Sequence, residues 1–166
     1  MPRDLEQEML RAVVERVTKL RDDVRENISR TGKRASGRTQ ASLRVEVDGD
    51  HIILYGRAFF ATLENGSAPW DGHTGVRCSF KEFKEIIRQW AMDKGLHEIA
   101  RNESALYLVT RKIIREGSLD YRRGGGDDVY TTLVDTALTD ISTNTTALLS
   151  TAINDSILKW SKNRRI

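Results

Sequence analysis

The residue types best able to carry out chemistry in this chain are its histidines and its one cysteine: His51, His73, His97 and Cys78. His73 and Cys78 fall close together in one expected loop, but a zinc site needs about four ligands and two are missing from the neighbouring sequence. Nothing around Cys78 matches a local signature of a cysteine nucleophile, although a Cys–His pair assembled by folding stays open. We therefore expect no catalytic residue, no metal site and no cofactor, and a protein that is not an enzyme.

A run of positive charge occupies residues 30–44, which contain no acidic residue. Its cations are Arg30, Lys33, Arg34, Arg38 and Arg44. The glycines and serines between them predict a loop rather than a helix. A flexible basic loop can lie along phosphates with little sequence preference, so this loop is our candidate for contact with DNA. Two other interpretations stay open: a solvated linker, and a segment that docks on an acidic surface of a protein partner.

A second candidate site lies in residues 65–79, which are rich in glycine and show no apolar period. Loops of this length are often functional or become ordered by a partner. Pro69 and Trp70 are the expected partner-contact residues, because aromatic side chains on loops often anchor interfaces. Equally open is that Trp70 tucks back onto its own domain.

The composition, 39% hydrophobic and 31% charged over 166 residues, is that of a soluble globular protein. The net charge of +3 is too small to indicate nucleic-acid binding by itself. A single cysteine allows no intramolecular disulfide, and the first residues lack the apolar core of a signal peptide, so we expect an aqueous, reducing, cytoplasmic setting. No stretch approaches the roughly 18 apolar residues of a membrane span, and we expect no membrane partner.

The elements that must position these residues are organised around a predicted β-hairpin. Leu43, Val45 and Val47 alternate with charged residues, which is the pattern of a half-buried strand. Turn residues follow at 48–50, and residues 51–55 form a returning strand that is apolar on both faces. A lone hairpin is only marginally stable in water. We therefore expect helices on one face and further strands, or a neighbouring copy of the chain, on the other.

Apolar residues at helical spacing predict helices over 4–29, 79–95 and 102–116. The second begins with the Ser-x-x-Glu pattern of a capping box at Ser79, and Gly95 and Gly117 are placed to end the second and third. The expected buried side chains of these two helices are Phe83, Ile86, Ile87 and Trp90 in one, and Ala105, Leu106, Leu108, Val109, Ile113 and Ile114 in the other.

The remainder of the chain is predicted to be a linker and a C-terminal helical segment. Residues 118–128 contain three consecutive glycines and are expected to be flexible. Helical periodicity returns from Asp128, with Asp127 or Asp128 as the expected cap. The patch 142–146 has poor helix propensity and is the expected place for a break. An unbroken helix would be about 50 Å long, more than this small body covers.

Together these elements predict an α+β fold. It consists of a small antiparallel β-sheet built around the hairpin, packed by a long N-terminal helix and further helices, with a long C-terminal helical segment. We expect one domain over residues 1–166. Its parts are the N-terminal helix (1–30), the hairpin core (41–64), two helices (79–116) and the C-terminal segment (128–162).

Several short motifs also follow one another in a recognisable order. Ser-Gly-x-Thr-x-x-Ser-Leu at 36–43 comes after the N-terminal helix, and Glu-x-Gly-Ser at 64–67 comes after the strand pair, with Pro69 next. Trp90-Ala91 then lies in a helix that ends at Lys94-Gly95. This order resembles the neck and tail-completion proteins of tailed bacteriophages, the small head–tail joining family also described as minor tail or virion morphogenesis proteins.

The chain departs from the usual family pattern in two places. The family commonly reads Tyr-Ala-x-x-Val-Glu-x-Gly-Thr where residues 60–67 have Phe in place of Tyr and Ser in place of Thr. The helix after the glycine linker commonly starts with Pro-Phe, where this chain has Val129-Tyr130.

The resemblance implies a ring-forming structural subunit at the head–tail interface of a virion, through which DNA passes. Its implied partners are other copies of itself and the portal, adaptor or tail proteins, and its implied location is the virion, after assembly in the host cytoplasm. An alternative from another class is a small cytoplasmic nucleic-acid-binding regulator that uses the basic loop 30–44. A third is an enzyme that uses Cys78 or His73.

Overall fold

The computed structural model describes residues 3–57, 60, 62–70, 79–125 and 128–163 of the chain. The contacts cluster in two compact units. Unit 1 consists of Met1–Val24, Arg44–Tyr55 and Tyr130–Ile166, and unit 2 of Arg25–Leu43 and Gly56–Val129. Each unit is therefore built from segments far apart in the sequence. The single domain that we expected from the sequence stays a prediction.

The α+β fold class is confirmed. The chain is mostly helical, and the described residues include a small two-stranded antiparallel sheet, a long N-terminal helix and a long C-terminal helix. The helices are α1 (Arg3–Arg30), α2 (Arg38–Ala41), α3 (Thr62–Asn65), α4 (Phe80–Asp93), α5 (His97–Arg101), α6 (Glu103–Glu116), α7 (Leu119–Arg122) and α8 (Thr131–Asn163). The strands are β1 (Arg44–Asp48) and β2 (His51–Tyr55).

The hairpin of unit 1 has the predicted strands and turn. Asp48 pairs with His51, so Gly49 and Asp50 form a two-residue turn, and Gly49 has the positive φ of 60° that such turns require. Val45 and Leu54 share one face of the pair and are half-buried, whereas the opposite face is exposed. Among the described residues the sheet has two strands, so the further strands that we considered are not seen there.

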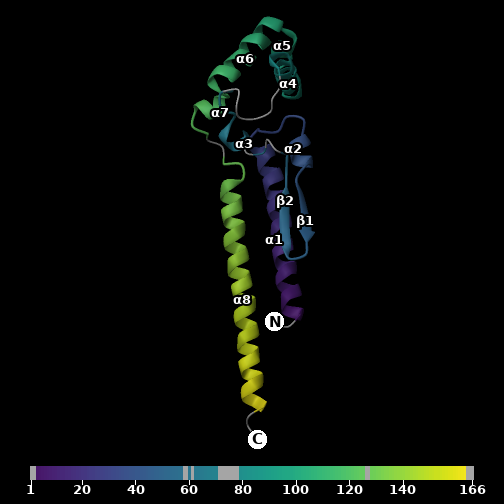
Figure 1. Ribbon diagram of the computed structural model, residues 1–166, viewed down its shortest axis with the longest axis vertical. Helices are drawn as coiled ribbons and strands as arrows, with labels where there is room; N and C mark the ends of the chain where they lie inside the picture. The colour runs from purple at the N-terminus through teal and green to yellow at the C-terminus, as the bar shows by residue number, and fades with distance from the viewer. Residues whose placement is uncertain (1–2, 58–59, 61, 71–78, 126–127, 164–166) are drawn as a thin grey trace. The chain divides into compact units, whose positions relative to one another are not determined.

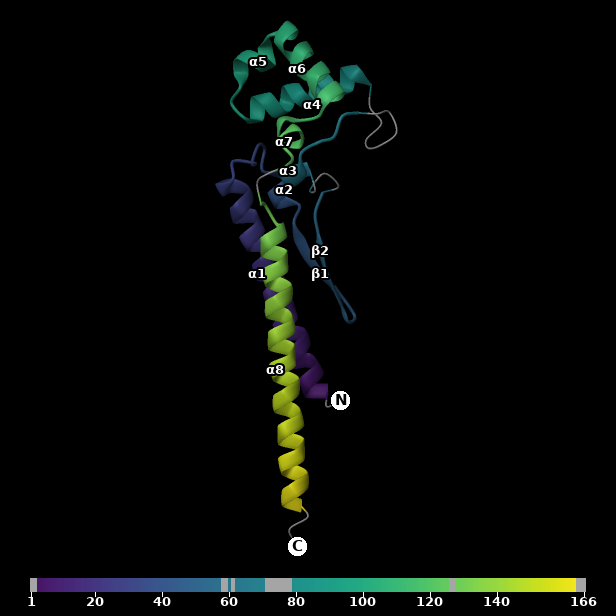
Figure 2. The ribbon, with the colours of Figure 1, turned by 90° about the vertical axis from the view of Figure 1, so that its left-hand side faces the viewer.

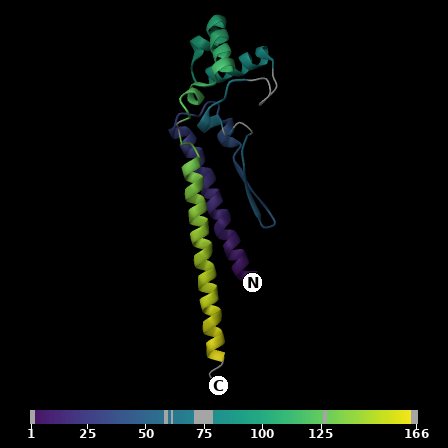
Figure 3. The same ribbon diagram turned by 60° about the vertical axis from the view of Figure 1, so that its left-hand side comes forward.

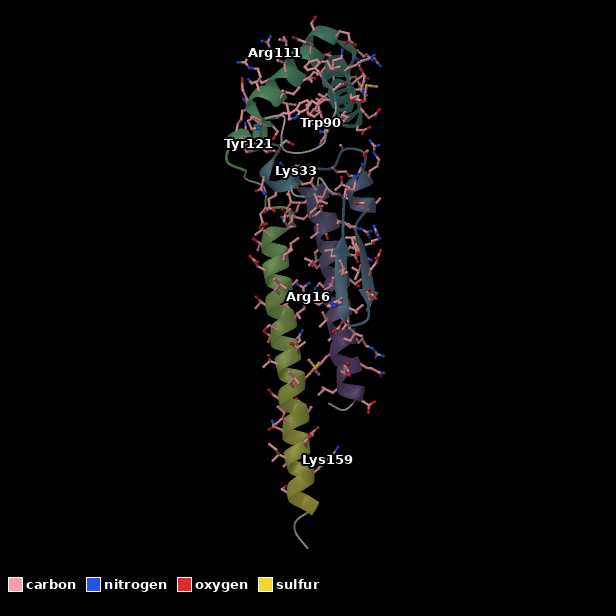
Figure 4. All side chains as sticks on the ribbon, viewed as in Figure 1. Arg16, Lys33, Trp90, Arg111, Tyr121 and Lys159 are labelled. Carbon is pink, nitrogen blue, oxygen red and sulfur yellow. The ribbon has the colours of Figure 1, made fainter. Side chains whose placement is uncertain are left out.

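Helices α1 and α8 of unit 1 run antiparallel, with α1 between α8 and the hairpin (Figure 1). Figure 4 shows Arg16 between the two helices, where its Nε donates to Oδ2 of Asp140 at 2.8 Å. Leu20 and Val24 of α1 are buried. The far end of α8 continues past the start of α1, as the turned view in Figure 3 also shows. This part of α8 therefore has no cover from α1.

The sequence left open whether residues 142–146 divide the C-terminal segment into two helices, and α8 is continuous over 33 residues. The hydroxyls of Thr145 and Thr146 donate to the carbonyls of Ile141 and Ser142, so they are hydrogen-bonded within the helix. Helix α8 begins at Thr131, three residues after Asp128, and the aspartate cap stays a prediction. Asp127 lies outside the described residues.

Unit 2 contains a group of three helices, α4, α5 and α6, which pack on one another (Figure 2). The predicted capping box is present: the hydroxyl of Ser79 accepts from the Glu82 amide, and the Glu82 carboxylate accepts from the Ser79 amide. Gly95 follows α4 and Gly117 follows α6, both with positive φ. Sequence analysis missed α5, whose five residues are too few to show a period.

Three of the expected core side chains are exposed instead. Ile86 and Trp90 of α4 are 53% and 42% exposed, because the buried line of this helix runs through Ile87 and Ala91. Leu108 of α6 is 63% exposed, because Leu106 and Thr110 occupy the buried side of that helix. The apolar stripes were too broad for the sequence to show which edge faces the neighbouring helix.

The end of α1 is fastened to the segment before α8 by one buried amide. Asn27 is 6% exposed, and its Nδ2 donates to the carbonyls of Asp128 at 2.9 Å and Val129 at 2.8 Å. Its Oδ1 accepts from Arg30. Ile28, which follows Asn27, and Val129, whose carbonyl accepts from Asn27, are fully buried. All the hydrogen-bonding groups of the Asn27 side chain are thus used.

We expect Asn27→Ala to destabilise the protein by about 2 kcal/mol, because it removes a buried amide and its hydrogen bond to the carbonyl of the buried residue Val129. Asn144→Ala is the matched control, since Asn144 is exposed on α8 and its replacement changes stability by no more than about 0.5 kcal/mol. Urea unfolding followed by circular dichroism measures both. Equal losses in the two variants would contradict the role given to the buried amide.

Candidate functional site

The basic segment 30–44 is not the single flexible loop predicted from the sequence. Arg30 is the last residue of α1, Arg38 the first of α2, and Arg44 the first of β1. Only residues 31–37 and 42–43 lie outside helix and strand. The loop prediction was wrong because it rested on the local content of glycine and serine, whereas hydrogen bonds from α1 hold part of the segment.

Those bonds come from α1. Nε of Arg25 donates to the Gln40 carbonyl at 3.0 Å, and its Nη2 donates to the Leu43 carbonyl at 2.6 Å. Nε2 of Gln40 returns a bond of 2.6 Å to the Arg25 carbonyl. The C-terminal part of the four-residue helix α2 and the residues just after it are therefore held against α1. It begins after Gly37, whose φ of 79° is open to glycine and costly for other residues.

Several cations of the segment have partners within unit 2. Nζ of Lys33 lies 2.6 Å from Oδ2 of Asp120 on α7. Nη2 of Arg38 lies 3.6 Å from Oδ2 of Asp93 at the end of α4. Arg30 donates through Nε and Nη2 to Oδ1 of Asn27. The interpretation as a solvated linker is therefore not what the structure shows for these side chains.

Arg34 and Arg44 complete the predicted set. Arg34 is exposed, and a Cβ added at Gly37 would lie 3.5 Å from its Nε, so the guanidinium rests beside that glycine. Arg44 belongs to unit 1, where its Nε lies 2.6 Å from Oε1 of Glu46. Its Cζ lies 4.8 Å from the centre of the Tyr55 ring. The structure thus groups Arg30, Lys33, Arg34 and Arg38 in one unit and Arg44 in the other.

A residue that sequence analysis did not select joins this group. The ammonium of Lys94, at the end of α4, donates to the carbonyl of Gly32. Burial lowers the pKa of Lys94, and repulsion from the nearby Lys33 lowers it further. No sequence signal links the two lysines, because they are far apart in the chain and meet only through the fold.

The segment with Pro69 and Trp70 is attached to the junction of α6 and α7. The amide of Trp70 donates to the Ile114 carbonyl at 2.8 Å, and the Ser118 amide donates to the Ser67 carbonyl at 2.8 Å. The Ser67 amide donates to the hydroxyl of Ser118 at 2.9 Å. The backbone of residues 67–70 is thus hydrogen-bonded to its own unit, as in the interpretation that Trp70 tucks back onto its domain. Pro69 and Trp70 are half-buried.

Two glycines permit this attachment. Gly66 has a φ of 72°, and a Cβ there would lie 2.3 Å from the amide nitrogen of Tyr121. Gly117 has a φ of 80°, and a Cβ there would lie 2.7 Å from the Ser67 carbonyl oxygen. Both positions combine a left-handed backbone with a contact too close for any side chain. The Glu-x-Gly-Ser motif at 64–67 therefore has a packing role.

The predicted linker 118–128 is also partly helical, which corrects the sequence analysis. Ser118 caps α7, its hydroxyl accepting from the Tyr121 amide, and α3 packs against α7. Sequence analysis missed this turn because the glycines that follow it dominate the local composition. Gly126 and Asp127 lie outside the described residues.

The residues considered for chemistry do not form a described cluster. His51 lies on β2 in unit 1 and His97 begins α5 in unit 2. His73 and Cys78 fall in residues 71–78, which the structure does not describe. Within the described ranges no group of three or more His, Cys, Asp or Glu side chains is arranged to hold a metal ion. In the same ranges, no helix is both long and apolar enough to span a membrane.

A shallow depression of about 450 Å³ lies on α4 and α6, beside the tilted ring pair of Phe80 and Tyr107. Two charged residues, Lys84 and Glu103, line it, and Nζ of Lys84 lies 3.0 Å from Oε2 of Glu103. Nη2 of Arg88 donates to Oε1 of the same carboxylate. These hydrogen bonds lower the pKa of Glu103. The charges of the depression are thus already paired with one another.

Comparison of the chain with known protein families, with curated protein sequences and with solved structures finds no match. The resemblance carried by the order of short motifs is therefore untested by these comparisons and stays a prediction.

We expect Gly66→Ala to destabilise unit 2 by at least about 2 kcal/mol more than Gly124→Ala. Both glycines have positive φ, but a Cβ at Gly124 meets nothing within 4 Å, so the control carries the backbone strain without the clash. Urea unfolding followed by tryptophan fluorescence gives both values. A cost for Gly66→Ala no greater than that of the control would show that the attachment of residues 66–70 is not tightly packed.

Proposed function

We propose that this protein is a structural subunit of a tailed-bacteriophage virion, which forms a homo-oligomeric ring at the head–tail interface through which DNA passes. It is not an enzyme in this proposal. Its partners are further copies of itself and the portal, adaptor or tail proteins, and it is assembled in the host cytoplasm before it enters the virion. The order of motifs from Ser36 to Gly95 suggests the family, and the exposed apolar side chains of unit 1 support assembly.

The observation that carries the proposal is the exposure of apolar side chains on the hairpin and on the far end of α8. Val47 and Ile53 of the hairpin are 49% and 38% exposed. Ile153, Ile157 and Leu158, on the far end of α8, are each more than half exposed. Ile153 and Ile157 lie one turn apart on the same side of α8, and an exposed apolar stripe of this kind often marks an interaction site. A helix end without cover gains stability when a neighbouring molecule packs on it.

The sheet supports self-association for a second reason. In the described part of the chain β1 and β2 pair only with each other, so each strand leaves one edge for a further strand. If β2 of one copy pairs antiparallel with β1 of the next, successive strands alternate in direction and the combined sheet is antiparallel throughout. Head-to-tail contacts of this kind generate a ring when the rotation between copies closes.

The rival function is a small nucleic-acid-binding regulator. The cations gathered at the end of α1 favour it, because they also suit a monomer or dimer that binds DNA directly. The two functions differ in assembly. A regulator does not need the exposed apolar side chains of α8 to be covered by further copies.

We expect the purified protein, alone or co-expressed with the products of neighbouring genes, to have the mass of a closed ring of several copies in light scattering. Ile153→Asp combined with Ile157→Asp lowers this mass to that of the monomer, because charges replace apolar contacts between copies.

The matched control is Leu108→Asp, a replacement of an apolar residue that is 63% exposed in unit 2. It leaves the mass of the assembly unchanged. A wild-type protein that stays monomeric or dimeric with every neighbour, and binds DNA tightly at low salt, would replace the ring with the regulator.

A further inference from the structure

Five cations of unit 2 gather around the end of α1, although they come from separate parts of the sequence. We call them the basic cluster, which consists of Arg30, Lys33, Arg34, Arg38 and Lys94. The hydrogen bond from Lys94 to Gly32 and the ion pair of Arg38 with Asp93 join the end of α4 to the segment after α1. Lys33 is labelled in Figure 4. The cluster is therefore a product of the tertiary fold.

Some cations of the basic cluster are held by groups that do not cancel their charge. Lys33 and Arg38 pair with the carboxylates of Asp120 and Asp93. Arg30 and Lys94 instead donate to neutral acceptors, the side-chain amide of Asn27 and the carbonyl of Gly32. A neutral acceptor satisfies a hydrogen bond without cancelling the charge, so Arg30 and Lys94 keep their positive charges in these bonds.

Repulsion within the cluster has a visible consequence at Lys94. Besides burial, the charge of Lys33 lowers the pKa of the Lys94 ammonium. A nearby anion stabilises the charged form of an amine and removes this repulsion. The ammonium has three donors, of which the structure uses one on Gly32, so it can donate to an anion while keeping that bond.

We propose that the basic cluster binds the sugar–phosphate backbone of duplex DNA, with Lys94 as a contact residue beside the arginines. This inference rests on the proposed function and deepens it, because it names the surface of the subunit that meets the DNA. Three of the five cations are arginines, whose planar guanidinium groups fit phosphate oxygens. Arg34 and Arg38 are exposed and therefore accessible to a long polyanion.

The composition of residues 29–42, which carry four of the five cations, favours DNA over an acidic protein surface. Residues 29–42 contain no large apolar side chain. Protein interfaces draw most of their affinity from buried aromatic, aliphatic or arginine anchors within an apolar core. Contacts to DNA phosphates are polar and need no such core. Small residues such as Gly32, Ala35 and Gly37 also let a phosphate backbone approach closely.

The test is the binding of a labelled duplex of random sequence to the full-length protein, measured by fluorescence anisotropy at several salt concentrations. The logarithm of the binding constant falls linearly with the logarithm of salt, and the slope shrinks by about 0.9 for each phosphate contact removed. We expect Arg34→Gln and Lys94→Gln each to reduce the slope by about this amount. Lys94→Arg keeps the wild-type slope.

The matched control is Arg111→Gln, which removes one positive charge from an exposed position on α6, away from Lys33 in Figure 4. It leaves the slope unchanged, and circular dichroism verifies that all variants are folded. An equal reduction of the salt slope in Arg111→Gln would mean that the net charge of the protein alone drives DNA binding, and would overturn the inference. Binding to polyglutamate but not to DNA would assign the cluster to an acidic protein and overturn the inference.

The mass of the ring and the salt slope are independent measurements. A ring that forms but binds DNA with the same slope in every variant overturns this inference and leaves the proposed function standing. A protein that does not form a ring, yet loses slope in Arg34→Gln and Lys94→Gln, overturns the proposed function instead.

Discussion

The buried amide of Asn27 is the interaction on which the organisation of unit 2 depends. It donates to the carbonyls of Asp128 and Val129 and accepts from Arg30, so one side chain joins the last turn of α1 to a segment about 100 residues later. A buried amide is costly unless all its groups are paired. This requirement fixes the last turn of α1, and with it the start of the segment that carries the basic cluster.

The basic cluster is held largely by groups that do not neutralise it. Carbonyl and amide oxygens accept from Arg30 and Lys94, so these side chains are positioned while their charges are retained. The ion pairs of Lys33 and Arg38 fix the cluster to α7 and α4. Positioned cations lose less side-chain entropy when an anion arrives, and for this reason the arrangement suits sequence-independent contact with phosphates.

Unit 1 poses a different physical problem, which is incomplete cover of apolar surface. A two-stranded sheet and a 33-residue helix are both marginal without neighbours, and their exposed side chains include Ile53 and Ile157. Repetition of the chain around an axis would cover both with the same contact in every copy. The exposed apolar side chains of unit 1 therefore support the proposed ring independently of the cations in unit 2.

The sequence by itself determined the elements whose signals are local. The period of α1, the alternation and turn of the hairpin, the capping box at Ser79 and the glycines that end α4 and α6 all act within a few residues, so they are readable without the fold. Tertiary structure alone decided which edge of α4 is buried, why α2 and α7 form within predicted loops, and that α8 continues through residues 142–146. It also decided the membership of the basic cluster, because Lys94 and Asp120 reach residues 32 and 33 only after distant segments have packed together.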